Sequence, residues 1–268
     1  MTDSLFDVSD QVVLVSGGSR GIGKALARGF AERNALVVIA GREAATLKTA
    51  AEDISVGAHP VQTVVCDVAE TAQIEQCVQQ VINDCGHIDT LLNVAGVNIR
   101  QPANDFTDEQ FDFVLDINLR GAFFMAQKVG RHLTERGSGC VINIDSLNSH
   151  SPLTNVTPYA MSKCGLNGMT QALAREWGPD GVRVNGLAPG FILTDLTQQL
   201  WSDPTMQEWG RFNTPMSRLG LPDDLVGTAV FLASPAAAFL TGQTIYVDGG
   251  LISGRNWPIP TDGGQSRE

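Results

Sequence analysis

Tyr159 and Lys163 stand four residues apart in a segment whose apolar residues have helical spacing. Side chains at this spacing project from the same face of a helix. A free tyrosine titrates near pH ~10, and a neighbouring ammonium group favours the phenolate. The pair therefore predicts a tyrosine that transfers a proton near neutral pH. By itself such a pair is common on helix surfaces, so the hypothesis needs further groups.

Ser146 follows the apolar run 141–144 and supplies a hydroxyl where such a run ends. A hydroxyl at this place can donate to an oxygen on which negative charge develops during a reaction. The alternatives are a helix cap and an ordinary loop hydroxyl. We predict that Ser146 acts together with Tyr159.

A glycine-rich turn, residues 16–23, follows the apolar run 12–15 and precedes a helical pattern. Its glycines stand at positions 17, 21 and 23. Backbone N–H groups at the start of a helix bind anions, so this turn predicts a pyrophosphate site. A tight turn without a ligand is the alternative.

Strands and helices alternate along the chain and must position these groups. Helical patterns cover 22–32, 44–54, 74–82 and a long amphipathic stretch at 110–133. The apolar runs that predict strands are 12–15, 36–39, 61–65, 88–92, 141–144, 182–187 and 243–247. This order predicts an α/β fold, a doubly wound parallel Rossmann sheet of about seven strands with helices on both faces.

Composition excludes several classes of function. The net charge of -11 leaves no basic surface for nucleic acid or an anionic membrane. The five cysteines lack metal-site spacing, and their odd number indicates no disulfide framework. No signal peptide or membrane-spanning run is visible, so we expect a cytoplasmic protein without a metal.

Four motifs together resemble the short-chain dehydrogenase/reductase family, and the resemblance covers roughly residues 8–250. They are the glycine turn, Asn93-Val94-Ala95-Gly96, Tyr159-Ala160-Met161-Ser162-Lys163 and the ending 242–250. Val94 stands where the family usually has an asparagine. The resemblance implies one dinucleotide-binding domain, 1–268, a carbonyl reductase or alcohol dehydrogenase acting by hydride transfer. It implies that Lys163 also bonds the nicotinamide ribose and that Asn118, which bends its helix, completes the catalytic set with Ser146, Tyr159 and Lys163.

The cofactor residues follow from the glycine turn, from the resemblance and from charge. Neither position 40 nor position 41 carries the acid that would bind the ribose 2'-hydroxyl of NAD(H). Arg20 and Arg42 can instead pair with a 2'-phosphate. We therefore expect NADP(H), with NAD(H) as the alternative. The predicted cofactor residues are Gly17, Ser19, Arg20, Gly21, Ile22, Gly23, Arg42, Asp67, Val68, Asn93, Ala95, Gly96, Tyr159, Lys163, Pro189, Gly190, Ile192 and Thr194.

The substrate candidates are Arg100, Asn148, His150 and Trp201. An arginine that follows residues 93–96, as Arg100 does, resembles the gluconate 5-dehydrogenase and 2-deoxygluconate dehydrogenase branch of the family. Arg100 could bind a substrate carboxylate through two hydrogen bonds. We therefore expect a sugar acid, polyol or small ketone as the small-molecule substrate. A hydrophobic or acyl-chain ketone, as in 3-oxoacyl reductases, and a non-catalytic cofactor sensor or scaffold are the alternatives.

Two further segments have predicted roles. Residues 191–215 are rich in large apolar side chains and resemble the substrate lid of the family. The tail 251–268 contains prolines and glycines and is expected to form a partly ordered arm. The resemblance also implies a homotetramer packed through the helices that carry Asn118 and Tyr159 and through the last strand.

Overall fold

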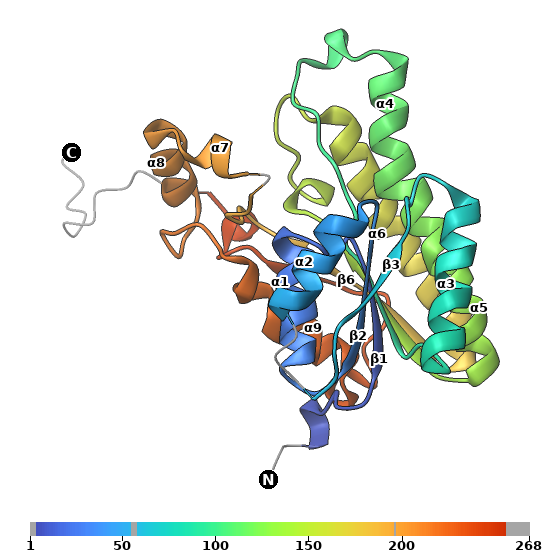
Figure 1. Ribbon diagram of the computed structural model, residues 1–268. Coiled ribbons are helices and arrows are strands. Elements are labelled where there is room, and N and C mark those ends of the chain that lie inside the picture. Colours follow the sequence, from blue (N-terminus) through green and yellow to red (C-terminus); the bar gives the residue numbers. More distant parts are fainter. Residues whose placement is uncertain (1–3, 55–57, 196, 256–268) are drawn as a thin grey trace, which may run out of the picture.

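The predicted apolar runs form the strands of one seven-stranded parallel sheet, with strand order β3-β2-β1-β4-β5-β6-β7 (Figure 1). The computed structural model describes residues 4–54, 58–195 and 197–255. The strands are β1 Val12–Ser16, β2 Leu36–Gly41, β3 Gln62–Val65, β4 Thr90–Asn93, β5 Gly139–Ile144, β6 Val182–Pro189 and β7 Thr244–Val247. This order confirms the predicted Rossmann fold, in which ligands bind at the carboxyl ends of the strands.

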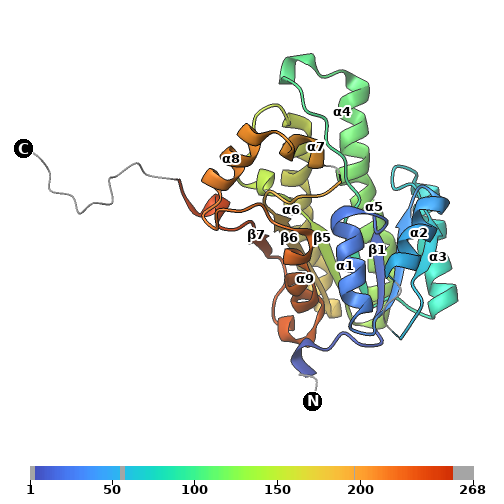
Figure 2. The ribbon, with the colours of Figure 1, turned by 60° about the vertical axis from the view of Figure 1, so that its left-hand side comes forward.

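Helices cover both faces of the sheet, and the two hydrophobic cores lie between sheet and helices (Figures 1 and 2). One core joins the sheet to α1, α2 and α9, and the other joins it to α3, α5 and α6. The helices are α1 Gly21–Ala31, α2 Ala44–Ile54, α3 Thr71–Cys85, α4 Asp108–Leu115, α5 Ala122–Arg136, α6 Thr157–Trp177, α7 Gln198–Trp201, α8 Pro204–Asn213 and α9 Val226–Ala233. The strands are buried from both sides, which explains why they are continuous apolar runs.

The long amphipathic stretch predicted at 110–133 is not one regular helix. A π-helical segment, Asp116–Gly121, joins α4 to α5. Asn118 lies inside this segment, where the resemblance implied a bend. π-helical turns insert a residue into the helical ladder and often occur at functional sites. The widened turn therefore redirects the chain at Asn118.

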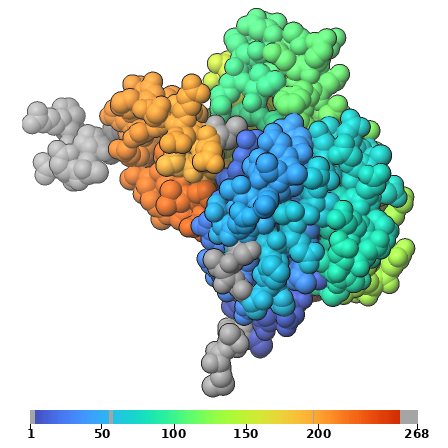
Figure 3. All heavy atoms as spheres, in the orientation of Figure 1, coloured from blue at the N-terminus to red at the C-terminus, as the bar shows by residue number. Residues whose placement is uncertain are grey.

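The short helices α7 and α8 lie within the segment 191–215 and stand at the same end of the sheet as α4 (Figure 2). Figure 3 shows their orange surface beside the blue surface of the N-terminal part of the chain. A small apolar cluster of Leu147, Phe191 and Trp201 packs beneath them. This cluster packs Phe191 and Trp201 of the predicted lid segment together with Leu147, which follows β5.

The tail begins with a single helical turn, Leu251–Ser253, and most of the predicted arm, residues 256–268, lies outside the described part. Among the helices of the described ranges, none combines the length and the apolar character that crossing a bilayer requires.

Candidate active site

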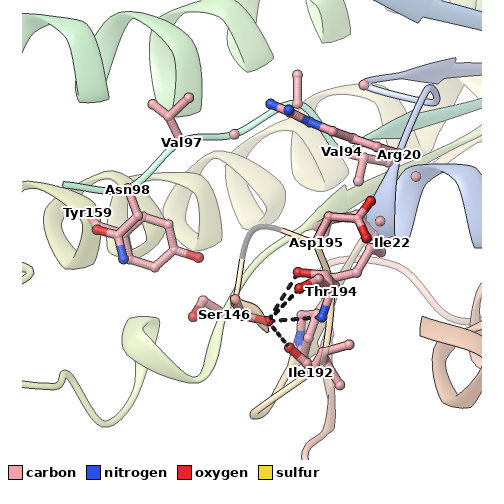
Figure 4. A pocket seen from close by; sticks show the side chains of 18 of the residues that line it. Arg20, Ile22, Val94, Val97, Asn98, Ser146, Tyr159, Ile192, Thr194 and Asp195 are labelled. Carbon is pink, nitrogen blue, oxygen red and sulfur yellow. Dashed lines mark hydrogen bonds between the residues drawn. The ribbon is translucent and has the colours of Figure 1, made fainter. Parts of the chain in front are cut away.

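One cavity of about 970 Å³ opens at the carboxyl ends of the strands. The glycine turn after β1, the start of α6, the loop after β4 and the segment around α7 all contribute to its lining. In the close-up of Figure 4, Tyr159 lies toward one end of this cavity and Arg20 and Ile22 toward the other. Its volume is at the upper end of the range for small-molecule and cofactor sites.

The glycine turn has the geometry of an anion cradle. Gly17 has a φ of +79°, and a Cβ there would come within 2.7 Å of the backbone nitrogen of Ala95. A Cβ on Gly23 would stand 2.1 Å from the carbonyl oxygen of Gly17. Arg20, the N-cap residue of α1, makes no side-chain cap, and the first turn of α1 carries no acid. The N–H groups at the start of α1 are therefore free to bind a phosphate group.

Two guanidinium groups line the cavity near this cradle. Arg20 and Arg42 are both exposed, and the described residues offer neither of them an ion-pair partner. Glu43, which follows Arg42, accepts a hydrogen bond of 3.0 Å from the Thr46 hydroxyl at the start of α2. Within the described ranges Glu43 forms no ion pair with Arg42, so the charge of Arg42 can bind an added anion.

Helix α6 presents Tyr159 and Lys163 to the cavity. Pro158 occupies its first turn, where proline starts a helix without losing a hydrogen bond. Lys163 is only 4% exposed, and its Nζ donates a 2.7 Å hydrogen bond to the carbonyl oxygen of Ile144 at the end of β5. The same Nζ lies 5.6 Å from the centroid of the Tyr159 ring. The predicted juxtaposition of phenol and ammonium is present.

Ser146 lies directly beyond β5 and lines the same cavity while being only 6% exposed. Its Oγ accepts hydrogen bonds from the backbone nitrogen and from Nδ2 of Asn148, both at 3.1 Å. Ser146 is the N-cap of a short 3₁₀ turn, 147–149, so the alternative of a helix cap is also present. The capping contacts use the acceptor positions of the hydroxyl and leave its hydrogen available.

Asp145 was not singled out by the sequence, although it lines the cavity and is 3% exposed. Burial raises the pKa of its carboxyl group, while the positive charge of Lys163 and a hydrogen bond from Asn167 act in the opposite direction. Its Oδ1 has no hydrogen-bond partner among the residues that the structure describes. An acid directly before Ser146, at the end of an apolar strand, is the signal that could have found it.

Asn118 holds the loop after β4 in place. Its Oδ1 accepts from the backbone nitrogen of Val97 at 2.8 Å, and its Nδ2 donates to the Val97 carbonyl oxygen at 2.9 Å and to the Ser162 hydroxyl at 3.1 Å. The described loop is also anchored at Gln101, whose nitrogen donates to the Asn155 carbonyl oxygen. Arg100 lies between these two anchors, is exposed, and lines the cavity.

The structure brings most of the predicted residues to the cavity. The lining includes Ser146, Asn148, Tyr159, Lys163, Arg100, Trp201, Gly17, Ser19, Arg20, Gly21, Ile22, Gly23, Arg42, Asp67, Val68, Ala95, Gly96, Pro189, Gly190, Ile192 and Thr194. Leu153 and Thr197 also line it, and no pattern in the sequence marked them.

Three of the predicted site residues, Asn93, Asn118 and His150, lie outside this lining. Asn93 is buried and donates through Nδ2 to the Ala122 carbonyl oxygen and to Oδ1 of Asn143, so it binds protein groups behind the cavity. Asn118 acts on the loop at Val97, not on the cavity directly. His150 is exposed, and its ring packs edge-on against Tyr246 at 5.9 Å.

Two of the predicted substrate residues that do line the cavity are already engaged. Trp201 is 4% exposed and packs against Phe191 with ring centroids 5.2 Å apart. Asn148 bonds Ser146 and the backbone of Leu153. Of the substrate candidates, Arg100 alone has both a place in the lining and an uncommitted charge within the described residues.

Comparison with known proteins gives a consistent result. A family described as enoyl-(acyl carrier protein) reductase matches residues 17–252. Gluconate 5-dehydrogenase of Gluconobacter oxydans (strain 621H) is 38% identical and is covered over 96% of its length by 92% of this chain. An NAD-dependent glycerol dehydrogenase of Listeria innocua is 34% identical, with the same two coverages.

The fold comparison points to the same group. The crystal structure of a gluconate 5-dehydrogenase from Burkholderia cenocepacia J2315, in complex with NADP and tartrate, superimposes with a TM-score of 0.90. It is 37% identical to this chain, and the match covers 94% of this chain and 98% of that one.

Proposed function

Since the chain belongs to the short-chain dehydrogenase/reductase family, we propose that it uses the cavity beside Tyr159 to oxidise a sugar acid at a secondary hydroxyl, and to reduce the corresponding ketone. The chain is an NAD(P)-dependent oxidoreductase that interconverts a secondary alcohol and a ketone by hydride transfer. The observation that carries the proposal is that Ser146, Tyr159 and Lys163 line one cavity with the anion cradle of α1 and the unpaired Arg100.

The residues present fit a dinucleotide. The turn of the glycine cradle can close only because positions 17 and 23 lack a Cβ, and the same cavity is lined by the cradle and by Tyr159. When bound, the nicotinamide supplies or accepts the hydride. In the proposed roles, Ser146 donates to the substrate oxygen, Tyr159 gives it or takes from it the proton, and Lys163 keeps a positive charge beside Tyr159.

The proposal includes a preference for NADP(H), which rests on Arg20 and Arg42. Replacing Arg42 with alanine is expected to raise the KM for NADPH by about 10- to 100-fold, because it removes a charge-assisted hydrogen bond to the 2'-phosphate. The KM for NADH should change less than about twofold, since a ribose hydroxyl offers no such charge. Initial rates over a range of NADPH and of NADH concentrations give the two KM values.

Lys48→Ala provides the matched control, because Lys48 is exposed on the neighbouring helix α2 and lies outside the cavity lining. An equal effect of Arg42→Ala on both cofactors would show that Arg42 does not select NADP(H). Equal rates of the unchanged enzyme with NADPH and NADH would also contradict the preference.

The substrate proposal rests on the free guanidinium of Arg100. Replacing Arg100 with alanine is expected to raise the KM for a sugar acid such as gluconate about 10- to 100-fold, since a bidentate contact to its carboxylate is lost. The kcat/KM for neutral polyols should fall less than about threefold, because they carry no carboxylate for Arg100 to bind. The measurement is kcat/KM for gluconate and for threitol or glycerol, in the unchanged enzyme and in Arg100→Ala.

The apolar lining residues Phe191, Leu200, Met206 and Trp209 support the alternative of a hydrophobic ketone. If Arg100→Ala left kcat/KM for sugar acids unchanged while apolar ketones were reduced well, the sugar-acid proposal would be wrong. In either case, segment 191–215 is proposed to cover the substrate as a lid.

We also place the protein, as part of the proposal, in the cytoplasm as a homotetramer whose whole chain acts as one dinucleotide-binding domain. All five cysteines are free thiols, a state that the reducing cytoplasm preserves. Phe113 on α4, Phe123 on α5 and Met161 on α6 are 43%, 36% and 49% exposed. Apolar side chains on these helices support an interface between subunits.

A further inference from the structure

The Asn148 side chain joins Ser146 to the following loop. Its Nδ2 donates to Ser146 Oγ at 3.1 Å, and its Oδ1 accepts from the backbone nitrogen of Leu153 at 2.9 Å. Asn148 is 5% exposed, although it lines the cavity. Both ends of the amide are therefore used inside the protein.

The orientation of this amide is fixed by chemistry. The backbone N–H of Leu153 can only donate, so the oxygen of the Asn148 amide must face it. The amide nitrogen then faces Ser146 and must donate to it. An amide in the opposite orientation would set two donors against each other at Leu153.

The hydroxyl of Ser146 consequently has both acceptor positions occupied. One takes the Nδ2–H of Asn148, and the other takes the backbone N–H of the same residue at 3.1 Å. A hydroxyl has two acceptor positions and one hydrogen. Among the described residues no group accepts that hydrogen, and Ser146 lines the cavity.

We propose that Asn148 is a positioning residue which keeps the Ser146 hydroxyl a donor toward the substrate oxygen. The inference rests on the proposed function, in which Ser146 stabilises that oxygen. A serine free to rotate would spend part of its time with the hydrogen directed at a protein acceptor. The amide prevents this, so the donor is preorganised before the substrate arrives.

The replacement Asn148→Asp tests the proposal because it keeps the shape and reverses one hydrogen bond. One carboxylate oxygen still accepts from Leu153, but the other accepts the Ser146 hydrogen and withdraws it from the substrate. We expect kcat to fall about 10²-fold, the usual effect of removing one such donor. The KM for NADPH should remain within about threefold, because Asn148 has no part in the cofactor contacts we propose.

Lowering the pH should restore activity to Asn148→Asp relative to the unchanged enzyme. Once protonated, the introduced carboxyl group donates to Ser146 as the amide does. The ratio of the two kcat values at each pH removes the contribution of titratable groups common to both proteins. The groups around this site are Asp145, His150, Tyr159, Lys163, Cys164 and Tyr246.

Ser146→Ala and the double variant Ser146→Ala/Asn148→Asp complete the cycle. Without the serine hydroxyl, the second replacement should lower kcat less than about twofold further, because the hydrogen that it would withdraw is already gone. A large additional loss in the double variant would mean that the new charge acts by itself and would overturn the proposal. So would an Asn148→Asp variant that turns over normally while Ser146→Ala is impaired.

A fully active Ser146→Ala enzyme would instead remove Ser146 from the proposed function, a separate failure. NADPH binding, followed by fluorescence, and thermal unfolding show whether each variant is folded. Should Asn148→Asp not fold, Asn148→Ala replaces it, because it removes Nδ2 but keeps the backbone donor. We expect Asn148→Ala to lower kcat about tenfold without recovery at low pH, and unchanged kcat in that variant would overturn the proposal.

Discussion

Replacement of Tyr159 with phenylalanine is expected to lower kcat by about 10³-fold or more in both directions of the reaction. The change removes one oxygen and keeps the ring that lines the cavity. Without the hydroxyl, the group that we propose to exchange a proton with the substrate oxygen is lost. NADPH should still bind, because the anion cradle at Gly17 and Gly23 is retained and phenylalanine keeps the ring at position 159.

Tyr246→Phe is the matched control for this experiment, since the chain contains two tyrosines. Tyr246 stands on β7, outside the cavity lining, and its hydroxyl contacts Ser149 Oγ at 3.2 Å. Its replacement should change kcat by less than about threefold, because a single neutral hydrogen bond away from the reacting atoms is lost. Undiminished activity of Tyr159→Phe with every substrate that the unchanged enzyme accepts would disprove the assignment of Tyr159.

Replacement of Lys163 with methionine is expected to lower kcat by about 10²- to 10³-fold. Methionine fills a similar volume but loses the donor to the Ile144 carbonyl oxygen and the charge 5.6 Å from the Tyr159 ring. The proposed proton transfer by Tyr159 then lacks the positive charge beside it. Alcohol oxidation and ketone reduction should therefore both be slowed.

Measurement of kcat for alcohol oxidation and for ketone reduction tests this effect. Lys128→Met is the control, because Lys128 on α5 forms a surface ion pair of 2.7 Å with Glu75 and lies outside the cavity lining. A surface pair of this kind contributes little to stability. If Lys163→Met kept the kcat of the unchanged enzyme in both directions, the proposed action of Lys163 on Tyr159 would be wrong.

The sequence predicted the sheet well because buried parallel strands are continuous apolar runs. The run 12–15 became β1, and 141–144 became the end of β5, so the residues that follow them had to reach the same edge of the sheet. For this reason Ser146 and the glycine turn both line the cavity. The spacing of Tyr159 and Lys163 within one helix fixed their common face.

Side-chain direction at the ends of strands was less predictable. Asn93 belongs to a matching motif, yet its amide points to Asn143 on the neighbouring strand, with which it is paired in the sheet register. The paired polar residues on β4 and β5 were a usable signal, but only once the register was known. His150 follows the 3₁₀ turn Leu147–Ser149 and lies outside the lining, a position that its spacing from Ser146 does not indicate.

The role of Asn148 could not be read from the sequence either. Its partner Leu153 lies five residues further along a loop, and no periodicity relates the two positions. Hydrogen-bond partners in irregular segments depend on backbone conformation that neither composition nor spacing determines. The same holds for Asp145, whose burial follows from the packing of α6 beside it, where Asn167 contacts its carboxyl group.

Transfer of deuterium from substrate to nicotinamide tests the central claim most directly. The unchanged protein is incubated with NADP⁺ and gluconate deuterated at its carbinol carbons, and the reduced cofactor is analysed by mass spectrometry. The account predicts one deuterium in the nicotinamide ring of each reduced cofactor, and its disappearance with Tyr159→Phe. No reduction of the nicotinamide with gluconate or any other sugar acid, polyol or secondary alcohol would contradict it.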